Sequence, residues 1–266
     1  MPETKDLLAG GGVKFSRAFV TRSLCCPSRA TILRGQYAHN HQILSNRLPL
    51  GGFDKFRSPG PEDSTIAAWL DEAGYDTMLI GKYFNGYDNT TYVPPGWDEW
   101  HGYLDDYVRS DTYRINENGQ INTYQRPQTH DTDLFADKAA TFLEGTAGGA
   151  PFFMYLSTNA PHTPAFAAQW HQDLFSDVPL PVPPSLNEAD VSDKPSWMRN
   201  TPELTPEEVS KLRQRHRQRL RSLQSVDEMV GRLVGILEET GELSNTYIVF
   251  TSDNGIHLGE HRIVVK

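Results

Sequence analysis

Two cysteines stand side by side in residues 23–35, SLCCPSRATILRG, and the chain has no others. Adjacent cysteines rarely bridge each other because disulfide geometry strains a dipeptide, so we expect two free thiols. A helix is predicted to begin near Ser28, and its free N–H groups would favour an anion beside Cys25. Arg29 would add a planar cation suited to an oxyanion. The alternative is a pair of buried structural cysteines before an ordinary helix.

Three further sets of polar residues each follow a predicted strand. They are Lys82 at the end of residues 76–82, His162 after residues 151–157, and Asp253 with Asn254 at the end of residues 245–253. Because open α/β sheets bind ligands beyond the carboxyl ends of their strands, we expect these residues to converge on one edge of the sheet. Each also has an ordinary alternative: a surface lysine, a loop histidine, or a turn of Asp, Asn and Gly.

The residue types suit both anions and cations. A lysine at the carboxyl end of a strand is well placed to bind an oxygen of sulfate or phosphate. Asp253 offers a charged oxygen and Asn254 a neutral one, which are ligands that hard divalent cations prefer. His39 and His41 in YAHNHQI resemble a zinc pair, but a spacing of two without a third ligand argues against zinc.

Alternating helices and strands must position these residues. Helices are predicted over residues 63–75, over residues 130–145, and over residues 205–240 with a break near Ser225. Helices placed between continuous apolar strands predict an α/β fold with a mostly parallel sheet and helices on both faces. Basic residues alternate by two between residues 211 and 221, which spreads them around a helix and predicts a solvated surface.

Composition limits the class of protein. The chain has 266 residues, with 25 Lys and Arg against 34 Asp and Glu, a formal net charge of −9. That length allows a full hydrophobic core. The acidic balance argues against general nucleic-acid binding but allows an anionic substrate bound by a few local cations. No apolar run approaches ~20 residues, so no membrane span is expected. The start, MPETKDLLAGGG, has no apolar signal core.

Four motifs resemble those of the sulfatase family and follow the family's order. SLCCPSRATILRG resembles its Cys-x-Pro-Ser-Arg signature, and GYDTMLIGKYF resembles its second signature. APHTP and TSDNG resemble its histidine and metal motifs. The motifs extend from residue 23 to residue 255, so the resemblance covers nearly the whole chain. LCCPSR, YAHNHQI and GKYFN are most similar to the branch with N-acetylglucosamine-6-sulfatase and its arylsulfatase relatives.

The resemblance implies an alkaline-phosphatase-like catalytic domain that hydrolyses aryl sulfates or sulfated sugars such as N-acetylglucosamine 6-sulfate. Cys25 would be oxidised to formylglycine by a formylglycine-generating enzyme, and Cys26 would be the variable residue of the motif. One hydroxyl of the hydrated aldehyde would attack sulfur and form a sulfated enzyme, a form of covalent catalysis. Such enzymes take part in glycosaminoglycan degradation and are mostly secreted, periplasmic or lysosomal, with a signal peptide that this chain does not show.

The same resemblance implies which residues bind the sulfate group. Arg29 and Lys82 would each bind it as cations. His162 would bind sulfate and protonate the leaving oxygen. Lys266 would be a second active-site lysine.

Calcium would be bound by Asp253, Asn254 and the modified Cys25, again by resemblance, and it would polarise the sulfate. One departure concerns a position where many sulfatases carry histidine. Phe84 fills that position here, and Asn85 is expected to replace the histidine in part.

The start and the end of the chain also depart from the family. No paired aspartates precede Cys25, and Lys266 is the final residue. Residues 1–266 are therefore expected to be a partial sulfatase catalytic domain that lacks the first metal-binding strand and the C-terminal part. Two alternatives stay open: a phosphonate or phosphate monoester hydrolase of the same superfamily, and a catalytically inactive, truncated sulfatase-like protein.

Overall fold

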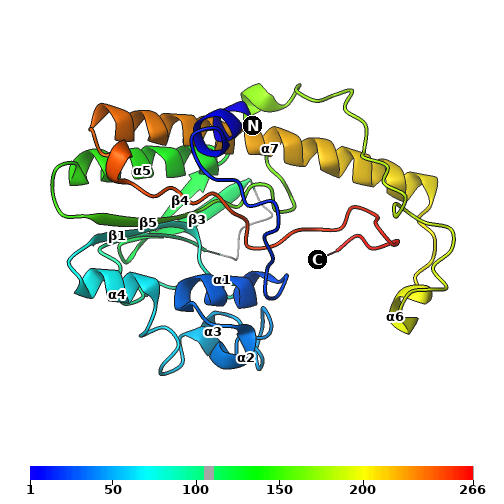
Figure 1. The fold of residues 1–266 in the computed structure, drawn as a ribbon, viewed down its shortest axis with the longest axis horizontal. Coiled ribbons are helices and arrows are strands. Elements are labelled where there is room, and N and C mark those ends of the chain that lie inside the picture. The colour runs from blue at the N-terminus through cyan, green and yellow to red at the C-terminus, as the bar shows by residue number, and fades with distance from the viewer. Residues whose placement is uncertain (105–110, 266) are drawn as a thin grey trace.

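The computed structural model describes residues 1–104 and 111–265, which form a five-stranded sheet between helices (Figure 1). The strands are β1 (Asp76–Lys82), β2 (Glu99–Tyr103), β3 (Thr112–Glu117), β4 (Gln120–Gln125) and β5 (Phe152–Ser157). Their order in the sheet is β4-β3-β2-β1-β5. Strand β1 runs parallel to β2 and β5, whereas β3 pairs antiparallel with both β2 and β4.

Helices cover both faces of the sheet, as the sequence predicted. They are η1 (Thr4–Ala9), α1 (Cys25–Arg34), α2 (Ala38–His41), α3 (Phe53–Phe56), α4 (Ile66–Glu72), α5 (Asp131–Thr146), η3 (Gln169–His171), α6 (Ser196–Arg199), α7 (Pro206–Glu239) and η4 (Leu243–Asn245). Figure 1 shows α5 and α7 on one face and α1 to α4 on the other. The fold is therefore an α/β layered structure.

Two hydrophobic cores hold these layers together. Met78 and Ile80 of β1 pack with Phe135 of α5 in one core, and Leu79 packs with Trp100 in the other. Side chains alternate between the two faces of a strand, so the apolar residues in the middle of β1 contribute to both cores. Burial of each such side chain contributes roughly 1.5–3 kcal/mol.

The longest helix, α7, is continuous. Thr205 and Glu208 form a capping box at its start, and Pro206 occupies the first turn, where its missing N–H costs nothing. The expected break near Ser225 is wrong, because α7 runs without interruption from Pro206 to Glu239 and Ser225 is buried within it. Within the described part of the chain, no helix is both long enough and apolar enough to cross a membrane.

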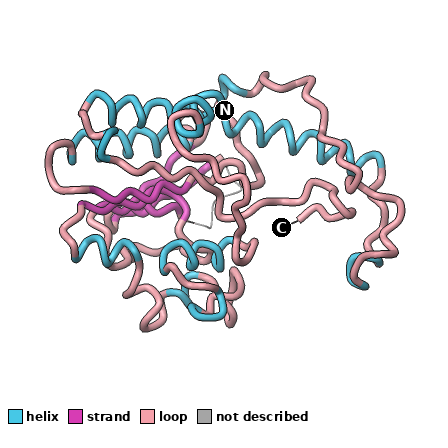
Figure 2. Tube along the Cα trace, viewed as in Figure 1, coloured by secondary structure: helices cyan, strands magenta, loops and turns pink. Residues whose placement is uncertain are grey.

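The expectation that the basic residues of α7 form a solvated surface is only partly correct, because Lys211 and Arg213 are exposed but others contact a neighbouring loop. Three arginines donate hydrogen bonds to backbone carbonyl oxygens: Arg217 to Val178 at 2.9 Å, Arg219 to Pro161 at 3.0 Å and Arg221 to Leu174 at 2.6 Å. These carbonyls belong to the long loop that follows β5 (Figure 2). An alternating pattern along a helix cannot reveal a loop that packs across it, so the helix positions the loop that carries His162.

The strand predicted over residues 245–253 is also wrong. In the described structure this segment pairs with none of the five strands, and Tyr247 and Val249 are 102% and 83% exposed. A strand needs a neighbour for its N–H and C=O groups, and apolar β-branched composition alone does not provide one. The segment still runs past the sheet and delivers Asp253 to its carboxyl edge.

Candidate active site

Cys25 is the first residue of α1 and is 1% exposed. The helix begins earlier than the predicted start near Ser28, and its N-cap residue Leu24 gives no side-chain hydrogen bond. Instead, Asn46 from another loop accepts a hydrogen bond from the Cys26 N–H at 2.9 Å. Cys25 therefore lies at the positive end of the helix, where the first-turn N–H groups favour an anion.

Cys26 points into the core instead. Its Sγ is fully buried and accepts a hydrogen bond from the Asn85 N–H at 3.3 Å. Burial raises the pKa of the Cys26 thiol to about 11, so it remains protonated. Phe84, at the position where many sulfatases carry histidine, stacks on Phe56 with ring centroids 4.2 Å apart. Cys26 and Phe84 are thus packing residues, whereas Asn85 lies between the core and α1.

Arg29, one turn after Cys25, joins several segments. Its Nη1 donates to the carbonyl oxygen of Lys82 and to the Ser157 hydroxyl, each at 2.6 Å. Its Nε donates to the Asp253 carboxylate at 3.0 Å. The structure therefore brings Arg29, the ends of β1 and β5, and Asp253 together at one edge of the sheet.

The electrostatics of this centre keep Arg29 charged. Burial alone would lower the pKa of the guanidinium, but Tyr155, Asp253 and Cys25 outweigh burial and raise it above the ordinary value. Arg29 is only 5% exposed, so water screens its charge little. A fixed cation next to the start of α1 strengthens the preference for an anion there.

Lys82 reaches this edge because of the glycine before it. Gly81 has a φ of 95°, and a Cβ on it would lie 2.0 Å from the carbonyl oxygen of Ser157. Only glycine permits this approach of β1 to β5. Lys82 is buried at the end of β1, and its own carbonyl accepts from Arg29.

The expected calcium ligands do not form a complete site. The Asp253 carboxylate is already paired with Arg29, and the buried Asn254 Nδ2 is a donor with no hydrogen-bond partner among the described residues. No group of three or more His, Cys, Asp or Glu side chains in residues 1–104 and 111–265 is arranged to hold a metal ion. Calcium usually takes six to eight oxygens, so these residues do not fit it. Lys266 lies outside the described residues.

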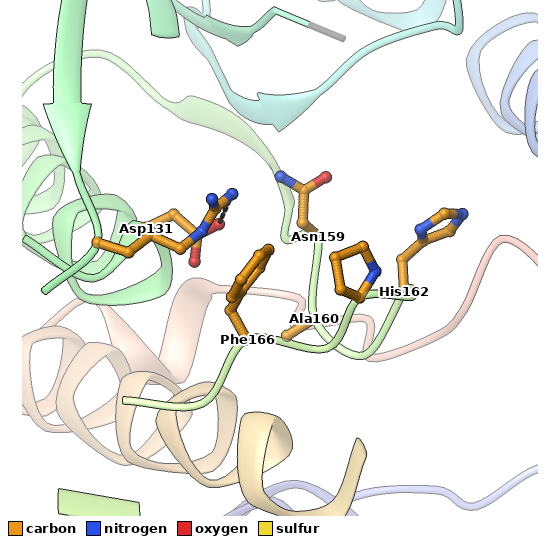
Figure 3. A pocket seen from close by; sticks show the side chains of 7 residues that line it. Asp131, Asn159, Ala160, His162 and Phe166 are labelled. Carbon is orange, nitrogen blue, oxygen red and sulfur yellow. Dashed lines mark hydrogen bonds and ion pairs between the residues drawn. The ribbon is translucent and has the colours of Figure 1, made fainter. Parts of the chain in front are cut away.

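His162 lies in the loop after β5, in a pocket of its own (Figure 3). Its Nδ1 is 2.8 Å from the carbonyl oxygen of Thr163. Arg126, Asn159 and Phe166 are among the residues that line the same pocket. His162 is therefore not one of the hydrogen-bond partners of Arg29, although both lie beyond the carboxyl end of β5.

Several residues of this region had no clear signal in the sequence. Asn46 is one polar residue in a Gly- and Pro-rich loop, and nothing marks it as a partner of Cys26. Arg126 follows β4, a strand that the sequence did not predict. Ser157, by contrast, ends a predicted strand, so the rule that selected Lys82 would also have selected it.

A second histidine cluster has the appearance of a hydrolytic triad. His171 Nε2 lies 2.8 Å from Glu228 Oε1, and its Nδ1 lies 3.4 Å from the Ser225 hydroxyl. Ser225 is buried in the middle of α7, so a substrate cannot reach it. The cluster therefore joins η3 to α7.

The two histidines considered for zinc are also structural. His41 is buried, its Nδ1 accepts from the Ile43 N–H at 3.0 Å, and its Nε2 lies 3.2 Å from the Thr31 hydroxyl. Both ring nitrogens are thus occupied by protein groups. His39 stacks on Tyr37.

Comparison with known proteins is consistent across the whole chain. A family profile described as Sulfatase matches residues 1–264. Arylsulfatase from Volvox carteri is 36% identical over 289 residues, covering 98% of this chain and 44% of that protein. N-acetylglucosamine-6-sulfatase from Homo sapiens is 36% identical over 276 residues, covering 100% and 49%. The chain spans about half the length of the curated relatives it matches.

The fold also matches solved structures. The structure of BT4656 in complex with its substrate D-glucosamine-2-N,6-O-disulfate superposes with a TM-score of 0.76 at 26% identity. The match covers 99% of this chain and 62% of that chain. The fold of this chain therefore resembles the matched part of that protein.

Proposed function

The chain belongs to the sulfatase family, and from this we propose that it carries the nucleophile and anion-binding residues of a sulfuric ester hydrolase. One observation carries the proposal: the buried, charged Arg29 joins the start of α1 to the ends of β1 and β5. We propose sulfated sugars as the substrate class, because the human relative is named an N-acetylglucosamine-6-sulfatase and BT4656 is in complex with a sulfated glucosamine.

Cys25 is the proposed site of maturation to formylglycine by a formylglycine-generating enzyme. Its surroundings fit that group, because the first turn of α1 and Arg29 both favour a partly anionic oxygen at this position. When formed, formylglycine supplies as its hydrate an oxygen nucleophile that a thiol cannot replace.

Arg29 and Lys82 are proposed to stabilise the charge of the sulfate group. Nε and Nη1 of Arg29 already donate to Asp253, Lys82 and Ser157, and its Nη2 makes no hydrogen bond to a described residue. Arg29 therefore acts mainly as a fixed positive charge with one free donor edge. Lys82, buried beside it, would add a second cation.

His162 is proposed to protonate the leaving oxygen, which general acid catalysis requires. Its loop is fixed by the hydrogen bond from Arg219 to the carbonyl oxygen of Pro161. The loop thus holds the imidazole near the end of β5.

Membership of the family is consistent with the use of a metal ion as well as formylglycine. The described residues do not fit a complete calcium site, so no step of this mechanism is assigned to calcium. Asp253 instead neutralises part of the charge of Arg29.

Parallel assays of an aryl sulfate, an aryl phosphonate and glucosamine 6-sulfate test the proposal. The chain should be produced with the maturation enzyme, and Cys25→Ala serves as the inactive control. Hydrolysis of the sulfate esters that is lost in Cys25→Ala would support the proposal. Faster cleavage of the phosphonate would favour the monoester hydrolase alternative, and no cleavage by chain with confirmed formylglycine would refute the proposed activity of this chain.

A further inference from the structure

A donor-rich pocket adjoins His162, and the Arg29 centre does not use it. Arg126, Asp131, Asn159 and Phe166 line it together with His162 (Figure 3). Arg126 directly follows β4. Since β3 is antiparallel to both β2 and β4, the strand β4 runs in the same direction as β1. The pocket therefore opens at the carboxyl edge of the sheet, the same edge as Lys82.

Arg126 is the central group of this pocket and is 7% exposed. Its Nη2 donates to the Tyr103 hydroxyl and lies 3.4 Å from Asp131 Oδ2. Its Nε and Nη1 are buried and have no hydrogen-bond partner among residues 1–104 and 111–265. Buried polar groups nearly always have partners, so two unsatisfied donors on one cation indicate a missing acceptor.

The remaining polar atoms of the pocket point to the same kind of ligand. Asn159 Nδ2 is a third buried donor that lacks a partner within the described chain. The Asp131 carboxylate is already engaged by Arg126 and by the Thr132 N–H. The unsatisfied groups are thus all N–H donors, which calls for a ligand that only accepts hydrogen bonds.

Phe166 gives the guanidinium a fixed orientation. The Arg126 Cζ lies 4.1 Å from the centroid of the Phe166 ring. The ring shields one face of the cation from water and leaves its edge for hydrogen bonding. A planar or tetrahedral oxyanion is the group that such an edge binds best.

We propose that this pocket binds a second acidic group of the substrate, either a carboxylate or a sulfate other than the one that is hydrolysed. The inference rests on the proposed function, because His162, which lines this pocket, is also the residue proposed to protonate the leaving oxygen. One sulfated glycan can then engage both the Arg29 centre and Arg126. Arg126 is thus a specificity-determining residue that selects substrates with two acidic groups.

Titration of three ligands into the full chain tests this inference. The ligands are glucosamine 6-sulfate, a glucosamine with a second sulfate, and 6-sulfated glucosamine linked to a uronic acid. A Cys25→Ala background prevents turnover. Arg126→Gln should weaken one or both doubly acidic ligands about tenfold to a hundredfold, because hydrogen bonds to charged groups are among the strongest. Glucosamine 6-sulfate should bind unchanged. The doubly acidic ligand that responds identifies the group as sulfate or carboxylate.

Two further variants test whether any loss of affinity comes from the pocket itself. Arg232→Gln removes an exposed, ion-paired arginine of α7 outside the pocket and should change none of the affinities. Asn159→Ala removes a donor without disturbing the stacking on Phe166, and it should weaken the same doubly acidic ligand severalfold even if Arg126→Gln fails to fold.

The outcomes separate this inference from the proposed function. Equal losses for all three ligands, or no loss for either doubly acidic one, would overturn the second-anion pocket while leaving sulfatase activity intact. Conversely, if the matured chain hydrolyses no sulfate ester but Arg126→Gln still weakens a doubly acidic ligand, the proposed activity fails and the pocket stands.

Discussion

At the scale of single residues, the two cysteines differ in every physical respect that matters for chemistry. Cys25 lies at a helix start next to the cation Arg29, whereas Cys26 is packed in an aromatic core with a raised pKa. The same contrast applies to Lys82 and Phe84, which lie two positions apart at the end of β1. Lys82 lies at the polar edge of the sheet, whereas Phe84 stacks on Phe56 in the core.

Cys25, and not Cys26, should carry the aldehyde in a cell that contains the maturation enzyme. Only Cys25 has the register of the motif, with Pro27 two residues later and Arg29 four residues later. Mass spectrometry of peptides covering residues 22–29 should show the cysteine-to-aldehyde mass change. Cys26→Ala should retain the modification and Cys25→Ala should abolish it. A change that maps to Cys26 would contradict the register argument.

Loss of the Arg29 guanidinium should strongly destabilise the fold. Arg29→Met leaves the Lys82 carbonyl and the Ser157 hydroxyl buried without their donor, and it unpairs Asp253. Removing one partner of a buried ion pair costs about 3–5 kcal/mol. Asp253→Asn should cost less, because the Asp253 side chain is 21% exposed. Urea unfolding of the single and double variants measures the coupling, and strictly additive effects would argue against the pair.

At the scale of elements, α7 acts as a support for the loop after β5. Its arginines hold carbonyl oxygens of that loop, and His171 of η3 bonds to Glu228 of the same helix. The loop has no regular structure over most of its length, so these contacts with a rigid helix replace internal hydrogen bonds. Contacts with α7 therefore help to fix the position of His162, because Arg219 holds the carbonyl oxygen of the preceding residue, Pro161.

Arg219→Ala should loosen the His162 loop without unfolding the sheet. The carbonyl oxygen of Pro161 would lose its donor, and the backbone on either side would open more often. Hydrogen–deuterium exchange should rise in residues 158–178 and stay constant in β1. Arg213→Ala, on an exposed face of α7, is the matched control. Equal exchange in the two variants would mean that Arg219 does not fix the loop.

His41, the last residue of α2, should make the free energy of unfolding depend on pH. Burial, followed by the charge of Arg34, lowers the pKa of His41 below 6.5, so the folded state binds fewer protons than the unfolded state. Stability from this group is therefore complete above pH 6.5 and declines as the pH falls below it. His41→Gln should flatten that decline, as measured by urea midpoints on both sides of pH 6.5.

His130, next to α5, contributes with the opposite sign. Burial opposes its charge, but the carboxylates of Asp133, 3.7 Å from its Nδ1, and of Asp131 outweigh burial and raise its pKa. The stability that His130 contributes is fully present below its unfolded-state pKa of 6.5. It is lost as the pH rises through its raised folded-state pKa. An unchanged profile in His41→Gln would show that other groups dominate the acid response.

At the scale of the whole molecule, the carboxyl edge of the sheet has two buried cations, Arg29 and Lys82, but few oxygen atoms that could bind a metal ion. Calcium titration by calorimetry should therefore give millimolar binding or none. Asp253 and Asn254 bring one negative charge between them, and that charge is already paired with Arg29. Micromolar binding would show that other groups complete the site. Asp253→Asn then serves to test whether Asp253 takes part.

Much of the fold could be predicted because its main elements have strong local patterns. β1 and β5 are continuous apolar runs bounded by glycine or proline, and α5 and α7 show clear helical periodicity. β2, β3 and β4 mix polar and apolar residues and were not predicted, and the hairpin of β3 and β4 is partly exposed. Residues 245–253 show the converse error, because pairing depends on a neighbouring strand and not on the segment alone.

The site divides in the same way. Lys82 lies at the end of β1 as predicted, whereas Asp253 contacts Arg29 although the strand predicted to carry it does not form. Arg126 and Asn46 could not be assigned, because each acts through a contact with a segment distant in the sequence. A contact between a single polar residue and a distant segment produces no periodic pattern in the sequence, so the sequence alone does not reveal it.

The bond between Arg29 and Asp253 spans 224 positions of the chain, which has a consequence for biosynthesis. At the usual pace of translation, roughly 5–20 residues per second, about 10 to 45 s separate the synthesis of the two partners. During that interval Arg29 lacks its bond to Asp253, so the surroundings of Cys25, which is 1% exposed in the folded chain, are incomplete. The contacts around Arg29 therefore cannot be completed until residue 253 has emerged from the ribosome.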